Sequence, residues 1–162
     1  MTTLEVDAIV NAANTSLLGG GGVDGAIHRK AGADLLAECR MLNGCPVGAA
    51  KLTKGYKLPA RFIIHTVGPK WNGGTLGERA KLVSCYRRSL ELAREKELQT
   101  IAFPRISTGI YGYPLREAAD TALATVHAEL EMHALPMRVI MCTYDALATQ
   151  IMTAALTELR GS

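Results

Sequence analysis

The sequence predicts an α/β fold in which one sheet is covered by helices on both faces, formed as a single domain over residues 1–162. Two observations predict this class. Short apolar runs rich in Val and Ile, typical of buried strands, alternate with longer segments whose apolar residues recur at helical spacing. The chain also has the length of one domain with a substantial core, and no repeat or linker divides it.

The composition excludes several classes of protein. Hydrophobic residues make up 48% and charged residues 20% of the chain, as in a globular protein. No apolar run could span a bilayer and no signal peptide is evident, so we expect a cytoplasmic protein without a membrane partner. The net charge of +3 does not favour nucleic acid as a partner. The four cysteines form no C-x-x-C pair, so neither zinc nor a disulfide is expected.

The first predicted strand, residues 6–10, leads into four consecutive glycines, Gly19–Gly22, and a predicted helix over 24–31 follows. Glycines carry no side chain, so a ligand can approach the backbone N–H groups there, with a helix N-terminus behind them. A flexible loop is the alternative. Asn14 and Asp24 flank the glycines, and Asp24 could either cap the helix or take part in chemistry.

The middle of the chain continues the alternation. A helix over 33–41 ends at an Asn-Gly pair, and strands over 50–54 and 61–67 precede a long helix over 76–96 with a charged outer face. His65 lies near the end of the second of these strands. We interpret it as a hydrogen-bonded core histidine rather than a catalytic base, because only one side of it can be polar.

A second loop of small residues, 107–112, follows a strand over 100–104. Gly109 and Gly112 would let backbone N–H groups face an anion, and hydroxyl groups could add donors. A plain strand-to-helix turn is equally compatible, since Pro114 suits the first turn of the next helix. A last strand over 138–143 and a closing helix over 146–159 complete the chain. The loops after the strands are expected to converge on one cleft.

The stretch from Asn11 to Arg29 resembles the macrodomain family, and in particular its bacterial, MacroD-like branch of ADP-ribosyl hydrolases and O-acetyl-ADP-ribose deacetylases. Residues 107–112 match the second phosphate-contacting loop of that family independently. The resemblance implies a three-layer α/β/α macrodomain with a mixed central sheet. The family's first strand, with its adenine-contacting Asp, is missing here, which would leave the strand over 6–10 at an exposed edge of the sheet.

The resemblance implies a ligand, ADP-ribose or its O-acyl ester, whose diphosphate would lie on the two loops and whose adenine would stack on Tyr144. Asp24 would hold or deprotonate a water and Asn14 would orient the distal ribose, as the two catalytic residues. No metal or other cofactor is needed. The remaining residues expected at the ligand are Asn11, Gly20, Gly21, Gly22, Val23, His28, Ser107, Thr108, Gly109, Ile110 and Tyr111.

The implied activity is removal of mono-ADP-ribose from acidic side chains of proteins, deacetylation of O-acetyl-ADP-ribose, or both. Two alternatives stay open. The same cleft could serve a non-catalytic module that reads ADP-ribose, and the chain could instead regulate an RNA-processing enzyme. The Asn14 and Asp24 pair favours catalysis over reading, and the low aromatic content of 5% does not favour RNA.

Overall fold

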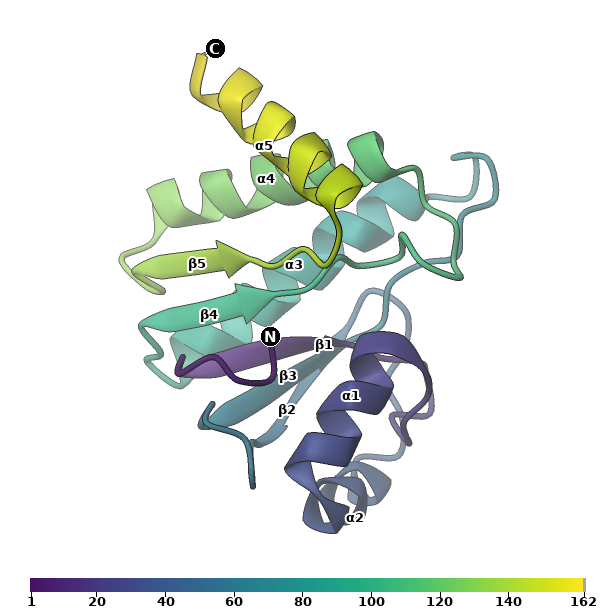
Figure 1. Ribbon diagram of the computed structural model, residues 1–162, viewed down its shortest axis with the longest axis vertical. Coiled ribbons are helices and arrows are strands. Elements are labelled where there is room, and N and C mark those ends of the chain that lie inside the picture. The colour runs from purple at the N-terminus through teal and green to yellow at the C-terminus, as the bar shows by residue number, and fades with distance from the viewer. Residues whose placement is uncertain (162) are drawn as a thin grey trace.

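A mixed sheet of five strands forms the centre of the computed structural model, which describes residues 1–161. The strand order is β2-β3-β1-β4-β5, as Figure 1 shows. Strands β1, β3, β4 and β5 run parallel, and β2 pairs with β3 in the antiparallel direction. The strands are β1 (Ala8–Ala12), β2 (Ala50–Lys54), β3 (Phe62–Thr66), β4 (Thr100–Phe103) and β5 (Arg138–Met141).

The helices form a layer on each face of the sheet (Figure 1). Helices α1 and α2 cover one face, α3 and α4 cover the other, and α5 packs on α4. The predicted alternation of strands and helices and the three-layer arrangement are therefore confirmed. The helices are α1 (Gly22–Ala31), α2 (Ala33–Met41), α3 (Glu78–Glu95), α4 (Leu115–Met132) and α5 (Ala146–Gly161).

Alternation along the strands divides the core between the two faces. Ile9 of β1 and Ile63 of β3 pack toward α1 and α2, whereas Val10 and Ile64 pack toward α3 and α4. All four side chains are fully buried. Side chains alternate along a strand, so Asn11 and His65, two positions after Ile9 and Ile63, lie on the same face of the sheet, beneath α1.

The first strand does not lie at an edge, and the expectation of an exposed edge over residues 6–10 is wrong. Ala8 pairs with Phe62 of β3 on one side and with Ile101 of β4 on the other. β2 and β5 form the two edges of the sheet over residues 1–161. A near-continuous Val and Ile run is what a parallel strand buried on both faces requires, and β1 is such a strand.

Some element boundaries also differ from the predicted ones. β1 begins at Ala8, and the Asp7 carboxylate accepts hydrogen bonds from the N–H groups of Gln99 and Thr100. Helix α1 begins at Gly22, two residues before the predicted start. The last glycine of the run thus belongs to the helix N-terminus. Among residues 1–161 no helix combines the length and the apolar character that crossing a membrane requires.

Candidate functional site

A cleft of about 650 Å³ opens at the carboxyl ends of β1, β4 and β5. Ligands of parallel α/β sheets bind at this edge, because the loops that leave neighbouring strands meet there. The loop before α1 and the loop after β4 form its walls, as predicted. Its lining consists of Ala12, Ala13, Asn14, Gly20, Gly21, Gly22, Val23, Asp24, Ala26, Gly68, Arg105, Ile106, Ser107, Thr108, Gly109, Ile110, Tyr111 and Tyr144.

The N-terminus of α1 opens directly onto the cleft. The residue before the helix, Gly21, has no side chain to cap the helix, so the first N–H groups of α1 are available to an anion. A side chain at Gly20 would crowd the polar groups of the cleft. A Cβ built on Gly20 would lie 3.2 Å from Asp24 Oδ2 and 3.4 Å from Asn14 Nδ2. The glycine run therefore leaves space beside the two polar side chains that the sequence singled out.

The opposite wall is a tight loop that hydrogen bonds hold in shape. The N–H of Tyr113 donates to Ser107 O at 2.9 Å, and the N–H of Gly112 donates to Gly109 O at 3.0 Å. Ser107 has a φ of 68°, in the left-handed region, and its hydroxyl oxygen is buried without a hydrogen-bond partner within residues 1–161. This oxygen lies against Gly68, where it leaves no room for a side chain, so the backbone of the loop rather than this hydroxyl faces the cleft.

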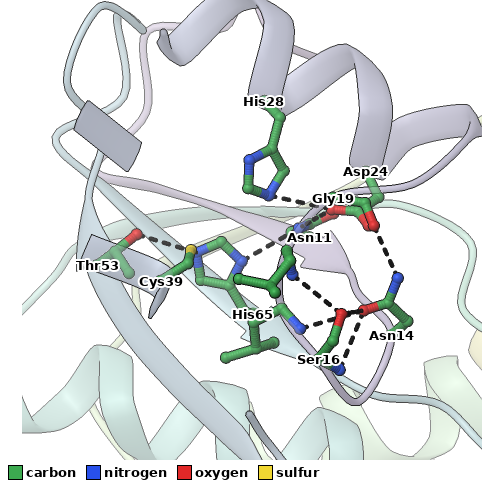
Figure 2. Close-up of polar contacts among 11 residues, drawn as sticks. Asn11, Asn14, Ser16, Gly19, Asp24, His28, Cys39, Thr53 and His65 are labelled. Carbon is green, nitrogen blue, oxygen red and sulfur yellow. Dashed lines mark hydrogen bonds and ion pairs between the residues drawn. The ribbon is translucent and has the colours of Figure 1, made fainter. Parts of the chain in front are cut away.

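Asp24 is the only acidic side chain in the lining. Its Oδ1 accepts a hydrogen bond of 2.8 Å from Asn11 Nδ2, and His28 Nε2 lies 3.4 Å from the same oxygen (Figure 2). Its Oδ2 faces the space beside Gly20. The carboxylate stands in the first turn of α1, where the helix dipole favours negative charge. One oxygen is therefore held by the protein and the other faces the cleft.

Asn14 shapes the glycine loop as well as lining the cleft. Its Nδ2 donates to Gly19 O at 2.8 Å, and its Oδ1 accepts from the N–H and hydroxyl of Ser16 and from the N–H of Leu17 (Figure 2). A side-chain amide has two N–H groups, so one remains for a ligand. The side-chain oxygen of Asn14 is committed to the loop, and only its nitrogen is suited to the ligand.

All the predicted site residues line the cleft except Asn11 and His28. Asn11 is fully buried beneath Asp24, and His28 lies one turn further along α1, behind the carboxylate. Both contact Asp24 rather than the open space. The predicted core role of His65 is confirmed, since His65 is fully buried and bonded on both ring nitrogens. Burial, with the nearby His28, lowers the pKa of His65 to about 3.

Sequence reasoning missed Arg105, the only basic side chain in the lining. Its guanidinium group lies 3.7 Å from Asp145 Oδ2, and Asp145 Oδ1 accepts a hydrogen bond from Ala148 N at the start of α5. Arg105 thereby connects the second loop to the end of the cleft where Tyr144 lies. A single charge directly after the apolar run of β4 was the available signal. Within residues 1–161 no three His, Cys, Asp or Glu side chains gather as a metal site would require.

Comparison with known proteins identifies the fold family. The family model for the macro domain matches residues 10–122. The chain belongs to the macrodomain family. This macrodomain is 61% identical over 160 residues to a macro domain-containing protein of Mesorhizobium japonicum, an alignment that covers 99% of this chain and 91% of the relative. It is 56% identical over 160 residues to the ADP-ribose glycohydrolase MACROD2 of Xenopus laevis, covering 98% of this chain and 38% of that protein.

Solved structures agree with this macrodomain across nearly its whole length. The Oceanobacillus iheyensis macrodomain with ADP superposes with a TM-score of 0.93 at 43% identity, covering 99% of this chain and 87% of that one. The Trypanosoma brucei macrodomain in complex with ADP-ribose gives a TM-score of 0.88 at 45% identity, covering 94% and 64%. The prediction of a MacroD-like macrodomain is thus confirmed.

Proposed function

We propose that this macrodomain binds ADP-ribose and hydrolyses its esters, with proteins mono-ADP-ribosylated on acidic side chains and O-acetyl-ADP-ribose as substrates. One observation carries the proposal. The Asp24 carboxylate is fixed through Oδ1 and presents Oδ2 to the cleft, beside Asn14 and an open space that Gly20 maintains. The relative named ADP-ribose glycohydrolase supports a hydrolytic reaction, and the neighbours solved with ADP and ADP-ribose support the ligand.

The parts of ADP-ribose would lie along the cleft in the order in which they are joined. The diphosphate would bind between the N–H groups at the start of α1 and the loop over 107–112, since both walls offer backbone donors to an anion. The adenine ring would stack on Tyr144, which is half-exposed at the far end. Arg105 would add positive charge between these two positions. The distal ribose would then lie beside Asn14 and Asp24.

In the reaction, Asp24 Oδ2 would hold a water and take its proton. The water oxygen would attack either the anomeric carbon or the acyl carbonyl carbon. Attack at the anomeric carbon breaks the bond from that carbon to the acyloxy oxygen, which leaves as a carboxylate. Attack at the carbonyl carbon breaks the bond from the acyl group to the ribose oxygen, which takes the proton back from Asp24. Either step yields a free carboxylic acid or carboxylate and ADP-ribose. The remaining N–H of Asn14 would donate to a ribose hydroxyl and fix its orientation. Binding of the diphosphate and adenine would position the reacting end.

The test is hydrolysis of a protein mono-ADP-ribosylated on glutamate by the wild type and by Asp24→Ala, with ADP-ribose titrated into both by calorimetry. We expect Asp24→Ala to bind ADP-ribose and to release it from protein at least about 100-fold more slowly, as loss of a general base predicts. Asp34→Ala, at an exposed acidic residue of α2, is the matched control. Release by Asp24→Ala at the wild-type rate would exclude this role. Binding without release by the wild type would indicate a reader of ADP-ribose.

A further inference from the structure

Beneath Asp24 lies a row of buried polar side chains that the proposed reaction does not touch. Asn11, His65 and Thr53 are all fully buried, on the neighbouring strands β1, β3 and β2. Figure 2 shows His65 between Thr53 and Asn11, with Asp24 beyond Asn11. They share the sheet face that α1 and α2 cover, because Asn11 and His65 lie two positions after Ile9 and Ile63.

The Asp24 carboxylate determines which atoms of this row donate hydrogen bonds and which accept them. Asn11 Nδ2 lies 2.8 Å from Asp24 Oδ1 and 3.1 Å from His65 Nδ1. A carboxylate only accepts hydrogen bonds, so Asn11 must turn its amide nitrogen toward Asp24. The same nitrogen, a pure donor, then faces His65. Nδ1 of His65 must therefore be unprotonated, and the neutral ring must carry its hydrogen on Nε2.

The other end of the row selects that same tautomer. His65 Nε2 lies 2.9 Å from Thr53 Oγ1 and 4.0 Å from the sulfur of Cys39. The Thr53 hydroxyl donates its own hydrogen to Lys54 O at 3.1 Å, so its oxygen is left to accept from Nε2. Asn11 thus donates in both directions, to Asp24 at one end and to His65 at the other, and from His65 each group donates to the next, through Thr53 to Lys54 O on the edge strand.

We propose that Thr53 and His65 are positioning residues for Asp24. By fixing the tautomer of His65 they fix the amide orientation of Asn11, which holds Asp24 Oδ1 and leaves Oδ2 for the water. Asn11 Oδ1 supports this assignment, since it is buried without a partner within residues 1–161. The amide keeps an orientation that costs it one hydrogen bond. The catalytic consequence rests on the proposed function, whereas the hydrogen-bond direction does not.

Loss of the hydroxyl acceptor at Thr53 would remove the constraint on the tautomer of His65 and on the amide orientation of Asn11. The Nε2–H of His65 would lose its partner, and the Nδ1–H tautomer would become competitive. That tautomer places a donor against the Asn11 amide nitrogen, so the amide would rotate and turn its oxygen toward Asp24. Two oxygens at that distance repel, and the carboxylate would move from its position in the cleft.

The first measurement compares Thr53→Val with Thr53→Ser, because valine keeps the shape of threonine and suits a strand whereas serine restores the hydroxyl. We expect Thr53→Val to lower kcat about tenfold or more, with KM and the Kd for ADP-ribose changed less than about twofold, since misplacing a catalytic group affects the reacting step. Thr53→Ser should recover most of the rate. Thr125→Val, which removes another buried threonine hydroxyl on α4, controls for a general packing effect.

The second measurement is independent of activity. In ¹⁵N NMR spectra of labelled histidine, His65 of the wild type should show a protonated Nε2 and an unprotonated Nδ1, and Thr53→Val should shift the population toward the other tautomer. An Nδ1–H tautomer in the wild type would overturn the proposal, and so would a kcat of Thr53→Val equal to that of Thr125→Val. If the wild type hydrolyses no ester yet shows the expected tautomer, the proposed function fails and the hydrogen-bond row stands.

Discussion

Single residues around the cleft act largely through the neighbours that hold them. Asn11 holds one carboxylate oxygen of Asp24, and the side-chain oxygen of Asn14 accepts hydrogen bonds from the loop before the glycines. Gly20 contributes by having no side chain, because its Cβ position is bordered by both groups. The polar geometry of this site therefore depends on the glycine as well as on the charged and amide groups.

Gly20→Ala tests this dependence. The added Cβ would approach Asp24 Oδ2 to 3.2 Å and Asn14 Nδ2 to 3.4 Å, in the space assigned to the water and ribose. We expect kcat to fall about tenfold or more, as displacement of reacting groups predicts. Gly21→Ala is the comparison, because its Cβ would meet no atom within 4 Å and its φ of −95° suits alanine. Equal effects of the two substitutions on kcat would argue against crowding at Gly20.

At the scale of elements, the sequence predicted the secondary structure of each segment better than the neighbours with which that segment pairs in the sheet. The Val and Ile content of residues 6–10 indicates a buried strand. The strand pairs with β3 and β4, where Ala8 lies opposite Phe62 and Ile101, and both residues are far from Ala8 in the chain. Local periodicity does not contain that pairing. The site loops were predictable because glycines mark them. Arg105 was missed because its place in the cleft depends on how the loop after β4 folds.

The carboxylate of Glu78 holds the loop before α3 in shape through several hydrogen bonds. Glu78 is buried at the start of α3 and accepts hydrogen bonds from the N–H groups of Asn72, Gly74 and Leu76. Burial alone would raise the pKa of Glu78, but these backbone donors outweigh it and lower the pKa to about 2. The N–H of Trp71, at the start of this loop, donates to Tyr111 O in the cleft wall. Glu78 thus supports the second loop indirectly.

Glu78 is therefore expected to contribute a pH-dependent part of the stability. Its pKa is lower in the folded chain than the ordinary value of 4.5, so its contribution is present above about pH 4.5 and is lost as the pH falls toward about 2. Urea unfolding at pH 5.5 and pH 3 should show a smaller loss of unfolding free energy for Glu78→Gln than for the wild type. Glu131→Gln, at an exposed residue of α4, serves as control. Identical pH dependence in all three proteins would contradict this role.

For the whole molecule, the cleft connects parts of the chain that lie far apart in sequence. Its walls come from the loop after β1, the loop after β4 and Tyr144 after β5, and these three neighbouring strands run parallel in the mixed sheet. A ligand that bridges these walls binds only when the sheet is folded and its strands are in register. Binding should therefore stabilise the fold as a unit rather than order one loop alone.

ADP-ribose should accordingly raise the melting temperature and protect both loops together. At about 100 times Kd, a ligand specific for the folded state adds about 2.7 kcal/mol, which for a domain of this size corresponds to roughly 5–10 °C. Hydrogen exchange should slow in residues 13–21 and 107–112 over the same range of ligand concentration. The two loops belong to different strands, so parallel protection requires a ligand that contacts both. Protection of residues 13–21 alone would mean that the ligand binds the glycine loop without bridging the cleft, and the assignment of 107–112 to the diphosphate would then be wrong.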